Sequence, residues 1–282
     1  MHLKSEPILR IAILDLYEGY ENQGMRCIND IILHWGVENG YRIDFKIFEV
    51  RQHLQLPDIK DFDVYISSGG PGSPLESEGT EWENKYFHFI SGINEWNTQI
   101  NNTLKKHVFF ICHSFQMACR YYNVATVCKR KSTSFGVFPI HRIDSGAEEI
   151  VFDELKDPFY VVDSRDYQVI EPKYEQLRAL GASILAIEKE RSHVPYERAI
   201  MAIRFNEYMI GTQFHPEADA IGMSMYLQKE DRKKSVVDNH GEAKWKSMIE
   251  QLQDPDKIRY TYSKVLPNFL SQAVNTSLVE ME

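Results

Sequence analysis

One cysteine and one histidine–glutamate pair in this chain have the types and spacing that thiol catalysis needs. Cys112 directly follows the apolar run Val108–Ile111, and His215 and Glu217 flank a proline much later in the chain. In an extended segment, residues two apart point to the same side, so the Glu217 carboxylate can orient the His215 imidazole and stabilise its cation. A thiol nucleophile, a base and an orienting acid together predict acyl transfer through a thioester.

The segment around Cys112 predicts a strand that ends at the cysteine and turns directly into a helix. A thiol at that point faces backbone N–H groups and the positive end of the helix dipole, and both favour the reactive thiolate. The alternative is a buried structural cysteine, which is how we interpret Cys119 and Cys128. For Cys112, the histidine–glutamate motif favours the catalytic interpretation.

Two further segments have the composition of pocket walls. Ser67–Pro74 is rich in glycine and follows a predicted strand, so its backbone amides can bind an oxyanion, although an ordinary turn has the same composition. It lacks the Lys-Ser/Thr ending of a phosphate-binding P-loop. Residues 163–169 carry several polar groups beside a strand, and we expect them to line a pocket or to form a salt-bridged loop.

These residues need a scaffold, and the hydrophobic pattern predicts one of the α/β class. Strands are expected at 9–14, 42–48, 64–67 and 108–111, with amphipathic helices at 26–39 and 80–104. Alternating strands and helices indicate a mostly parallel sheet with helices on both faces. Short strands without helices between them are expected at 135–143, 149–152 and 159–162, and further strands at 183–187, 199–204 and 208–214. We expect one domain over 1–217 and a helical C-terminal extension, 218–282, packed on it.

The composition excludes several classes of protein. A net charge of -9 over 282 residues argues against binding to nucleic acid or to an acidic membrane surface. The chain has no apolar run of ~18 residues and no signal peptide, so we expect neither a membrane span nor secretion. Its four cysteines lack a CxxC spacing, which favours the reducing cytoplasm. The histidines lack the spacing of metal ligands, and we expect no metal and no cofactor.

Three motifs in this order resemble the class I glutamine amidotransferases, the triad glutaminases: Ser68-Gly-Gly-Pro-Gly-Ser73, Ile111-Cys-His-Ser-Phe-Gln116 and Gln213-Phe-His-Pro-Glu217. The resemblance covers roughly residues 8 to 220 and implies a flavodoxin-like fold. It implies a nucleophile at Cys112, a base at His215 and an orienting acid at Glu217, with backbone amides of Gly70 and His113 as the oxyanion hole. For substrate binding we add Gly69, Gly72, Gln116, Ser164, Arg165 and Asp166. The substrate would be glutamine, and both a synthetase partner that accepts ammonia and a homodimer stay open.

Other interpretations also stay open. The chain is similar to the homoserine O-acyltransferases in Tyr121-Tyr122, in Phe135-Gly-Val-Phe138 and in Ser164-Arg165, which implies transfer from an acyl-CoA by the same triad. A hydrolase of γ-glutamyl peptides is a third hypothesis. The amidotransferase pattern has glycines two before and two after the cysteine, where this chain has Phe110 and Ser114. These two departures motivate the fourth hypothesis, a catalytically inactive binding module.

Overall fold

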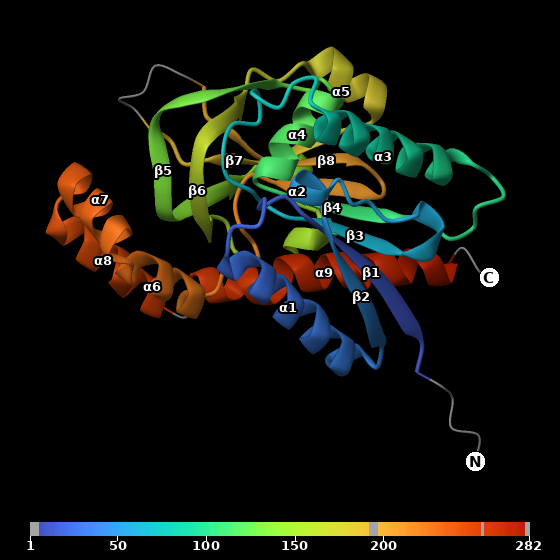
Figure 1. Cartoon of the computed structure of the whole chain (residues 1–282), viewed down its shortest axis with the longest axis horizontal. Coiled ribbons are helices and arrows are strands. Elements are labelled where there is room, and N and C mark those ends of the chain that lie inside the picture. Colours follow the sequence, from blue (N-terminus) through green and yellow to red (C-terminus); the bar gives the residue numbers. More distant parts are fainter. Residues whose placement is uncertain (1–5, 192–196, 255–256, 280–282) are drawn as a thin grey trace.

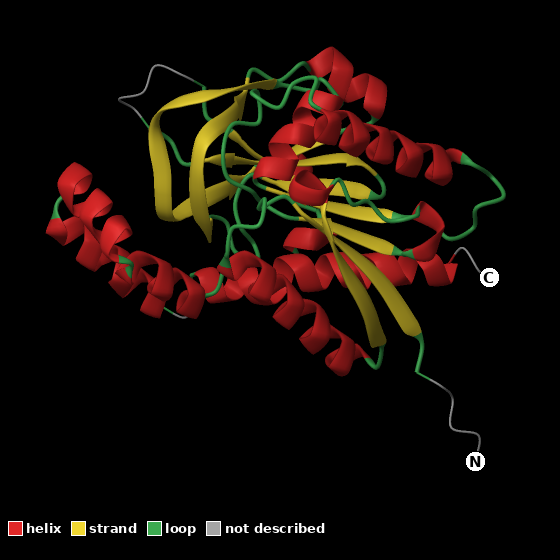
Figure 2. Cartoon of the chain, viewed as in Figure 1, coloured by secondary structure: helices red, strands yellow, loops and turns green. Residues whose placement is uncertain are grey.

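A computed structural model describes residues 6–191, 197–254 and 257–279 of the protein (Figure 1). Within these ranges, nine strands form one sheet in the order β2-β1-β3-β4-β9-β8-β7-β5-β6. Helices cover both faces of this sheet (Figure 2). The α/β class and the flavodoxin-like arrangement predicted from the sequence are confirmed.

The parallel half of the sheet positions the predicted motifs at one edge. It consists of β2 (Arg42–Glu49), β1 (Ile8–Asp15), β3 (Val64–Ser67), β4 (His107–Ile111) and β9 (Met209–Thr212). The glycine-rich segment follows β3, the thiol follows β4 and the imidazole follows β9. Because the carboxyl ends of parallel strands meet at one edge, the three motifs converge there.

The other half of the sheet is antiparallel and strongly curled. It consists of β8 (Ile200–Asn206), β7 (Ser183–Glu188), β5 (Thr126–Arg142) and β6 (Phe159–Ile170). The long strands β5 and β6 stand together at the end of the sheet, shown in green on the left of Figure 1. Their pairing shifts register between Lys129 and Ser134. The short strands predicted for this region at 135–143 and 159–162 are parts of these two long strands.

One prediction of local structure was wrong, and one helix was not predicted. Residues 149–152 do not form a strand: Ile150–Phe152 is a single turn of 3-10 helix, in which the Glu149 side chain accepts a hydrogen bond from the Val151 N–H. Its apolar side chains, Val151 and Phe152, join the core from that turn. Helix α5 (Tyr174–Leu180) was not predicted, because seven residues carry too little periodicity to be distinguished from a loop.

Two helical layers enclose the sheet. On one face lie α1 (Gln23–Asn39) and α9 (Ile258–Val279), and on the other lie α3 (Glu81–Thr98), α4 (His113–Tyr121) and α5 (Figure 1). A short helix, α2 (Val50–His53), and the turn Ile59–Asp61 lie in the connection between β2 and β3. Helix α1 is capped at its N-terminus by Asn22, whose side chain accepts a hydrogen bond from the Met25 N–H, and at its C-terminus by the left-handed Gly40.

The C-terminal helices have two different environments. Helix α9 buries Val265, Leu266, Phe269 and Leu270 in the main core. Helices α6 (Ala220–Gln228), α7 (Glu230–His240) and α8 (Glu242–Gln253) form an arm beside β5 and β6, orange on the left of Figure 1. The arm packs through a separate apolar cluster that includes Leu227, Val236 and Met248. A division into 1–217 and 218–282 stays a prediction.

Neither a membrane-spanning helix nor a metal-binding group of side chains is found among the described residues. No helix among them is long and apolar enough to cross a membrane. Within the same residues, histidine, cysteine, aspartate and glutamate side chains form no group of three or more that could hold a metal ion.

Candidate active site

Cys112 occupies a sharp turn between β4 and α4. Its backbone has φ 48° and ψ −96°, a conformation that costs energy for any residue with a side chain and that marks functional turns. The Cys112 N–H donates a hydrogen bond of 2.8 Å to the Thr212 carbonyl, which ties the turn to β9. The strand–cysteine–helix geometry expected from the sequence is therefore present, and the first turn of α4 lies directly beside the thiol.

The structure accommodates both residues that depart from the glycine pattern of the elbow. Phe110 is fully buried and contacts the Phe205 ring edge-on at a centroid distance of 5.9 Å. The Ser114 hydroxyl accepts from the Ile111 N–H at 2.8 Å and donates to the Ser67 carbonyl at 2.7 Å. A side chain at position 114 thus links the ends of β3 and β4 and leaves the turn intact.

His215 and Glu217 form the predicted pair. The His215 Nδ1 atom lies 2.8 Å from Glu217 Oε1, and the His215 N–H donates to the Val162 carbonyl of β6 at 2.9 Å. Burial on its own lowers the pKa of His215. The nearby charge of Glu217, which is hydrogen-bonded to the imidazole, and the proximity of Cys112 outweigh this effect and hold the pKa well above 6.5. The imidazole is therefore available as a cation beside the thiol.

The glycine-rich segment approaches the side chains of Cys112 and His215 closely. A Cβ atom at Gly69 would lie 2.9 Å from His215 Cε1 and 3.6 Å from Cys112 Cβ. At Gly70, a Cβ atom would lie 2.5 Å from the Leu16 carbonyl oxygen. Only glycine fits at either position without a shift of neighbouring atoms, so this segment can place its backbone against a substrate on Cys112.

Arg51, which was not predicted from the sequence, holds the glycine-rich segment in place. Its Nη1 atom donates to the carbonyls of Leu16 and Pro71, at 3.2 and 2.7 Å, and its Nη2 atom pairs with Glu18 at 2.9 Å. One guanidinium thus joins the loop after β1 to the loop after β3. No motif marks Arg51 in the sequence, because it follows β2 and reaches the site only through the fold.

His113 contributes to the site through its backbone. Its side chain is 2% exposed and packs toward Trp82, and burial together with the charges of Arg51 and Arg120 lowers its pKa to about 3. The imidazole is therefore neutral and is no substitute for His215 as a base. The His113 N–H stands at the N-terminus of α4, where a helix presents free amide donors.

Two glutamines connect α4 with the thiol. Gln116 Nε2 donates to Gln213 Oε1 at 3.1 Å, and Gln213 Nε2 lies 3.7 Å from Cys112 Sγ. Gln116, predicted to bind substrate, borders the cavity and is linked to the thiol by Gln213. Gln213 belongs to the histidine motif, but no local pattern indicates that its side chain faces the thiol.

Tyr17 is a second residue that was not predicted from the sequence. A Cβ atom at Gly24 would lie 3.0 Å from the Tyr17 hydroxyl and 3.2 Å from Glu217 Oε1, which places the phenol close to the catalytic carboxylate. Burial and the charges of Glu217 and Cys112 raise the pKa of Tyr17 well above 10, so the hydroxyl stays protonated. A signal was present: Tyr17 follows β1 at the same edge of the sheet as the other motifs.

The polar segment 163–169 lies in β6. Three of its residues were predicted to bind substrate, and all three border the cavity over the thiol: Ser164, Arg165 and Asp166. The Ser164 carbonyl accepts from Cys112 Sγ at 3.7 Å, whereas Arg165 is buried in ion pairs with Asp163 and Glu188. Asp166 is exposed and accepts a hydrogen bond from Thr133. The segment forms part of a strand that lines a pocket, and its arginine is salt-bridged as well.

The cavity over the thiol has a volume of about 1750 Å³. Its walls include residues of β5, β6, β7 and α6, and at the edge of the parallel strands Cys112, His113, Gln116, His215, Glu217, Gly70 and Gly72. The structure thus brings the predicted site residues into one cavity or, for Gly69, into contact with its catalytic side chains.

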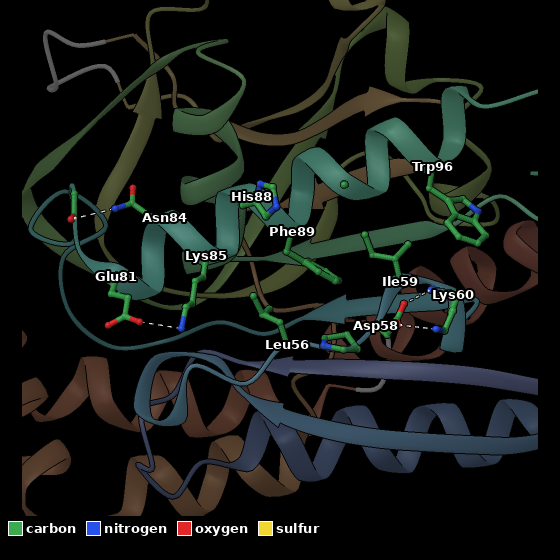
Figure 3. Close-up of a pocket in the computed structure, with 13 residues that line it drawn as sticks. Leu56, Asp58, Ile59, Lys60, Glu81, Asn84, Lys85, His88, Phe89 and Trp96 are labelled. Carbon is green, nitrogen blue, oxygen red and sulfur yellow. Dashed lines mark hydrogen bonds and ion pairs between the residues drawn. The ribbon is translucent and has the colours of Figure 1, made fainter.

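A second hollow, of about 920 Å³, lies between α3 and the segment around Ile59 (Figure 3). Charged side chains along it pair with each other, Lys60 with Asp58 and Lys85 with Glu81. Its lining contains no cysteine, serine or threonine among the described residues, so it offers no nucleophile of the kind found at Cys112.

Comparisons with known proteins identify the family and the fold. The family model for the class-I glutamine amidotransferases matches residues 25–229, and the chain belongs to that family. No curated protein sequence matches the chain.

Solved structures share the fold at low sequence identity. A glutamine amidotransferase from Thermotoga maritima has a TM-score of 0.66 at 15% identity, over 94% of this chain and 98% of that one. A glutamine amido transferase from Methylobacillus flagellatus has a TM-score of 0.61 at 13% identity, over 96% and 95%. The glutaminase domain of Trypanosoma brucei CTPS, with bound acivicin, has a TM-score of 0.57 at 14% identity, over 95% and 94%.

Proposed function

We propose that the protein hydrolyses the carboxamide of glutamine through a γ-glutamyl thioester on Cys112 and delivers the ammonia to an acceptor. Membership of the class-I glutamine amidotransferase family supports glutamine as the substrate. The observation that carries the proposal is the His215–Glu217 pair, 2.8 Å apart, which lines the same cavity as a thiol on a strained strand–helix turn.

In the first half-reaction, the Cys112 thiolate attacks the carboxamide carbon of glutamine. The backbone N–H groups of Gly70 and His113 stabilise the oxyanion that forms, each contributing ~3 kcal/mol. The His215 imidazolium gives its proton to the departing ammonia, and the raised pKa of His215 supports this role. The products are a γ-glutamyl thioester and ammonia.

In the second half-reaction, His215 takes a proton from a water molecule, which attacks the thioester. Glutamate leaves, and the thiol returns to its starting state. Glu217 orients the imidazole in both steps, while Gln116 and Gln213 position the sulfur. Gly69, Gly72, Ser164 and Asp166 contact the substrate in this scheme.

The acceptor is either held by a synthetase partner or bound by this chain. The name of the Trypanosoma brucei neighbour, the glutaminase domain of CTPS, is consistent with a separate synthetase partner. We place the protein in the cytoplasm, since all four of its cysteines are free. A homodimer remains part of the proposal.

One observation favours a second candidate, acyl transfer from an acyl-CoA by the same triad. The cavity of about 1750 Å³ exceeds the ~300–1000 Å³ of typical small-molecule sites and has room for more than glutamine. In that reaction the Cys112 thioester would carry the acyl group, and an amine or alcohol would replace water as its acceptor.

Intact mass spectrometry after brief incubation with acivicin, a reactive glutamine analogue, tests the proposal. We expect one adduct on wild-type protein, protection by glutamine, and no adduct on Cys112→Ala. Cys119→Ala is the matched control, since Cys119 is fully buried on α4 and should leave labelling unchanged. Absence of an adduct on wild type, or glutaminase activity retained in Cys112→Ala, would rule the scheme out. An adduct formed with an acyl-CoA instead would select the second candidate.

A further inference from the structure

Three arginines surround one glutamate at the curled end of the sheet, and we call Arg130, Arg165 and Arg191 with Glu188 the arginine cluster. Arg165 Nη2 donates to Glu188 Oε2 at 3.0 Å, and Arg130 Nη1 donates to the same oxygen at 3.4 Å. Arg191 pairs with the other oxygen, Oε1. Both oxygens of Glu188 are therefore used, although three guanidinium groups share them.

The arginine cluster has an excess of positive charge in a buried position. Asp163 adds one carboxylate, which accepts from Arg165 Nε at 2.9 and 3.0 Å. Among the side chains paired with one another here, three guanidiniums face two carboxylates, and the side chains of Arg130 and Arg165 are only 5% and 1% exposed. Asp166, Lys189 and Glu190 also line the cavity. Burial, with the charge of Arg165 next in importance, lowers the pKa of Arg130 to about 10. An uncompensated buried charge is costly, so this arrangement favours an additional anion.

One donor of the arginine cluster has no acceptor. The Nη1 atom of Arg165 is buried and lacks a hydrogen-bond partner among the described residues. Buried guanidinium N–H groups are normally satisfied, and the fork of an arginine matches the two oxygens of a carboxylate or phosphate. The chain as a whole carries a charge of -9, so this positive cluster is not part of a generally basic surface.

The arginine cluster borders the cavity that holds the thiol. All four of its residues line that cavity, together with the hydroxyl residues Ser132, Thr133 and Ser134 from the irregular part of β5. Cys112 lines the same cavity from the edge of the parallel strands, and its Sγ atom donates to the carbonyl of Ser164, the residue before Arg165, at 3.7 Å. The volume of about 1750 Å³ leaves room for a second molecule beside a glutamine bound at Cys112.

We propose that the arginine cluster binds the phosphate or carboxylate group of a second substrate, which occupies the cavity together with glutamine. The proposal rests on the function proposed above, and it adds that the acceptor is bound by this chain and is anionic. Glu188 and Asp163 hold the guanidiniums apart and oriented, and the incoming anion supplies the missing negative charge.

Calorimetric titration of the full-length protein with inorganic phosphate and, separately, with acetate tests this inference. We expect at least one anion to bind both to free protein and to protein carrying the acivicin adduct on Cys112. Binding of phosphate alone or of acetate alone identifies the class of the second substrate. We expect Arg191→Gln and Arg165→Lys each to weaken binding about tenfold or more, as the loss of a charge-assisted hydrogen bond implies.

The controls separate this inference from folding and from the proposed function. Arg191 is the least buried arginine of the cluster, so Arg191→Gln should fold even if Arg165→Lys does not; Arg42→Gln, at an exposed arginine of β2, should leave anion binding unchanged. No binding of either anion, or binding that Arg191→Gln leaves unchanged, would overturn the inference. Anion binding abolished by the acivicin adduct would also overturn it, because the arginine cluster would then hold the carboxylate of glutamine itself. If acivicin labels no thiol, the proposed function fails, while titration of free protein still decides whether the arginine cluster binds anions.

Discussion

Phe110 on β4 lies directly opposite Gly211 on β9 in the parallel register. A Cβ atom at position 211 would lie 3.0 Å from Phe110 Cβ and 2.8 Å from Cδ2 of Phe115. The amidotransferase pattern has a glycine two residues before the cysteine, and here the space is provided on the neighbouring strand instead. A bulky residue in the elbow is therefore compatible with the turn at Cys112.

Gly211→Ala should destabilise the protein and impair the thiol together. The added methyl group overpacks the core between two phenylalanines, which typically costs ~1–3 kcal/mol. Because Phe110 precedes Cys112 by two residues, its displacement should also lower the rate of acivicin labelling. Chemical denaturation and the labelling rate measure the two effects.

Gly181→Ala provides the comparison for that variant. Gly181 ends α5 in a left-handed conformation, φ 67°, with no atom within 4 Å of its Cβ position among the described residues. Its substitution should cost ~1 kcal/mol through backbone strain and leave labelling of the folded protein unchanged. Equal loss of labelling in both variants would show that lower stability alone explains the effect of Gly211→Ala.

Arg51→Lys should lower kcat more than it raises KM. An ammonium group cannot span the Leu16 and Pro71 carbonyls as the guanidinium does, so the glycine-rich segment loses its fixed position. If the Gly70 amide stabilises the oxyanion, its misplacement affects the transition state rather than substrate binding, with a loss of up to ~10²-fold. Steady-state kinetics decide the matter: an unchanged kcat with a raised KM would assign Arg51 to substrate binding.

Gly69→Ala should impair the imidazole while leaving the thiol in place. The new methyl group would contact His215 Cε1 at 2.9 Å, against 3.6 Å for Cys112 Cβ, so His215 must shift. We expect glutaminase activity to fall at least tenfold, since the base leaves its hydrogen-bonding position. The prediction would be contradicted if Gly69→Ala kept full activity and its His215 ring signal in NMR spectra matched that of wild type.

Local patterns in the sequence predicted part of the site and most of the scaffold. Cys112, His215 and Glu217 stand at strand ends within recognisable motifs, and parallel strands bring their carboxyl ends to one edge. The amphipathic helices and the buried strands were found because their periods differ, and the α/β class followed from their alternation.

The contacts that complete the site depend on the fold and were not predictable in this way. Arg51 reaches the glycine-rich segment from the connection after β2, and Glu188 reaches Arg165 from the end of β7. The long pair β5–β6 appeared as short strands because its irregular register interrupts the alternation of side chains. The space opposite Phe110 is a property of strand register, which no single segment reveals.

Glu217→Gln should lower the pKa of His215 and change how stability depends on pH. The Glu217 charge and hydrogen bond help to hold that pKa well above 6.5, and the neutral amide removes the charge. In the wild type, a pKa raised by folding stabilises the protein fully below pH 6.5, and this contribution is lost as the pH rises through the raised value. The difference in unfolding free energy between wild type and Glu217→Gln should therefore be largest near pH 6 and shrink toward alkaline pH. This difference in unfolding free energy amounts to ~1.4 kcal/mol for every pKa unit by which His215 differs between the two proteins.

NMR titration of the His215 Cε1–H signal checks the direction of this effect, with Glu207→Gln as a surface control on the turn between β8 and β9. The wild-type signal should remain that of imidazolium above pH 7, while Glu217→Gln should titrate at lower pH. Activity should fall in parallel, because a neutral imidazole has no proton to give to departing ammonia. If His215 titrates at the same pH in both proteins, the carboxylate only holds the ring in position and does not maintain the cation.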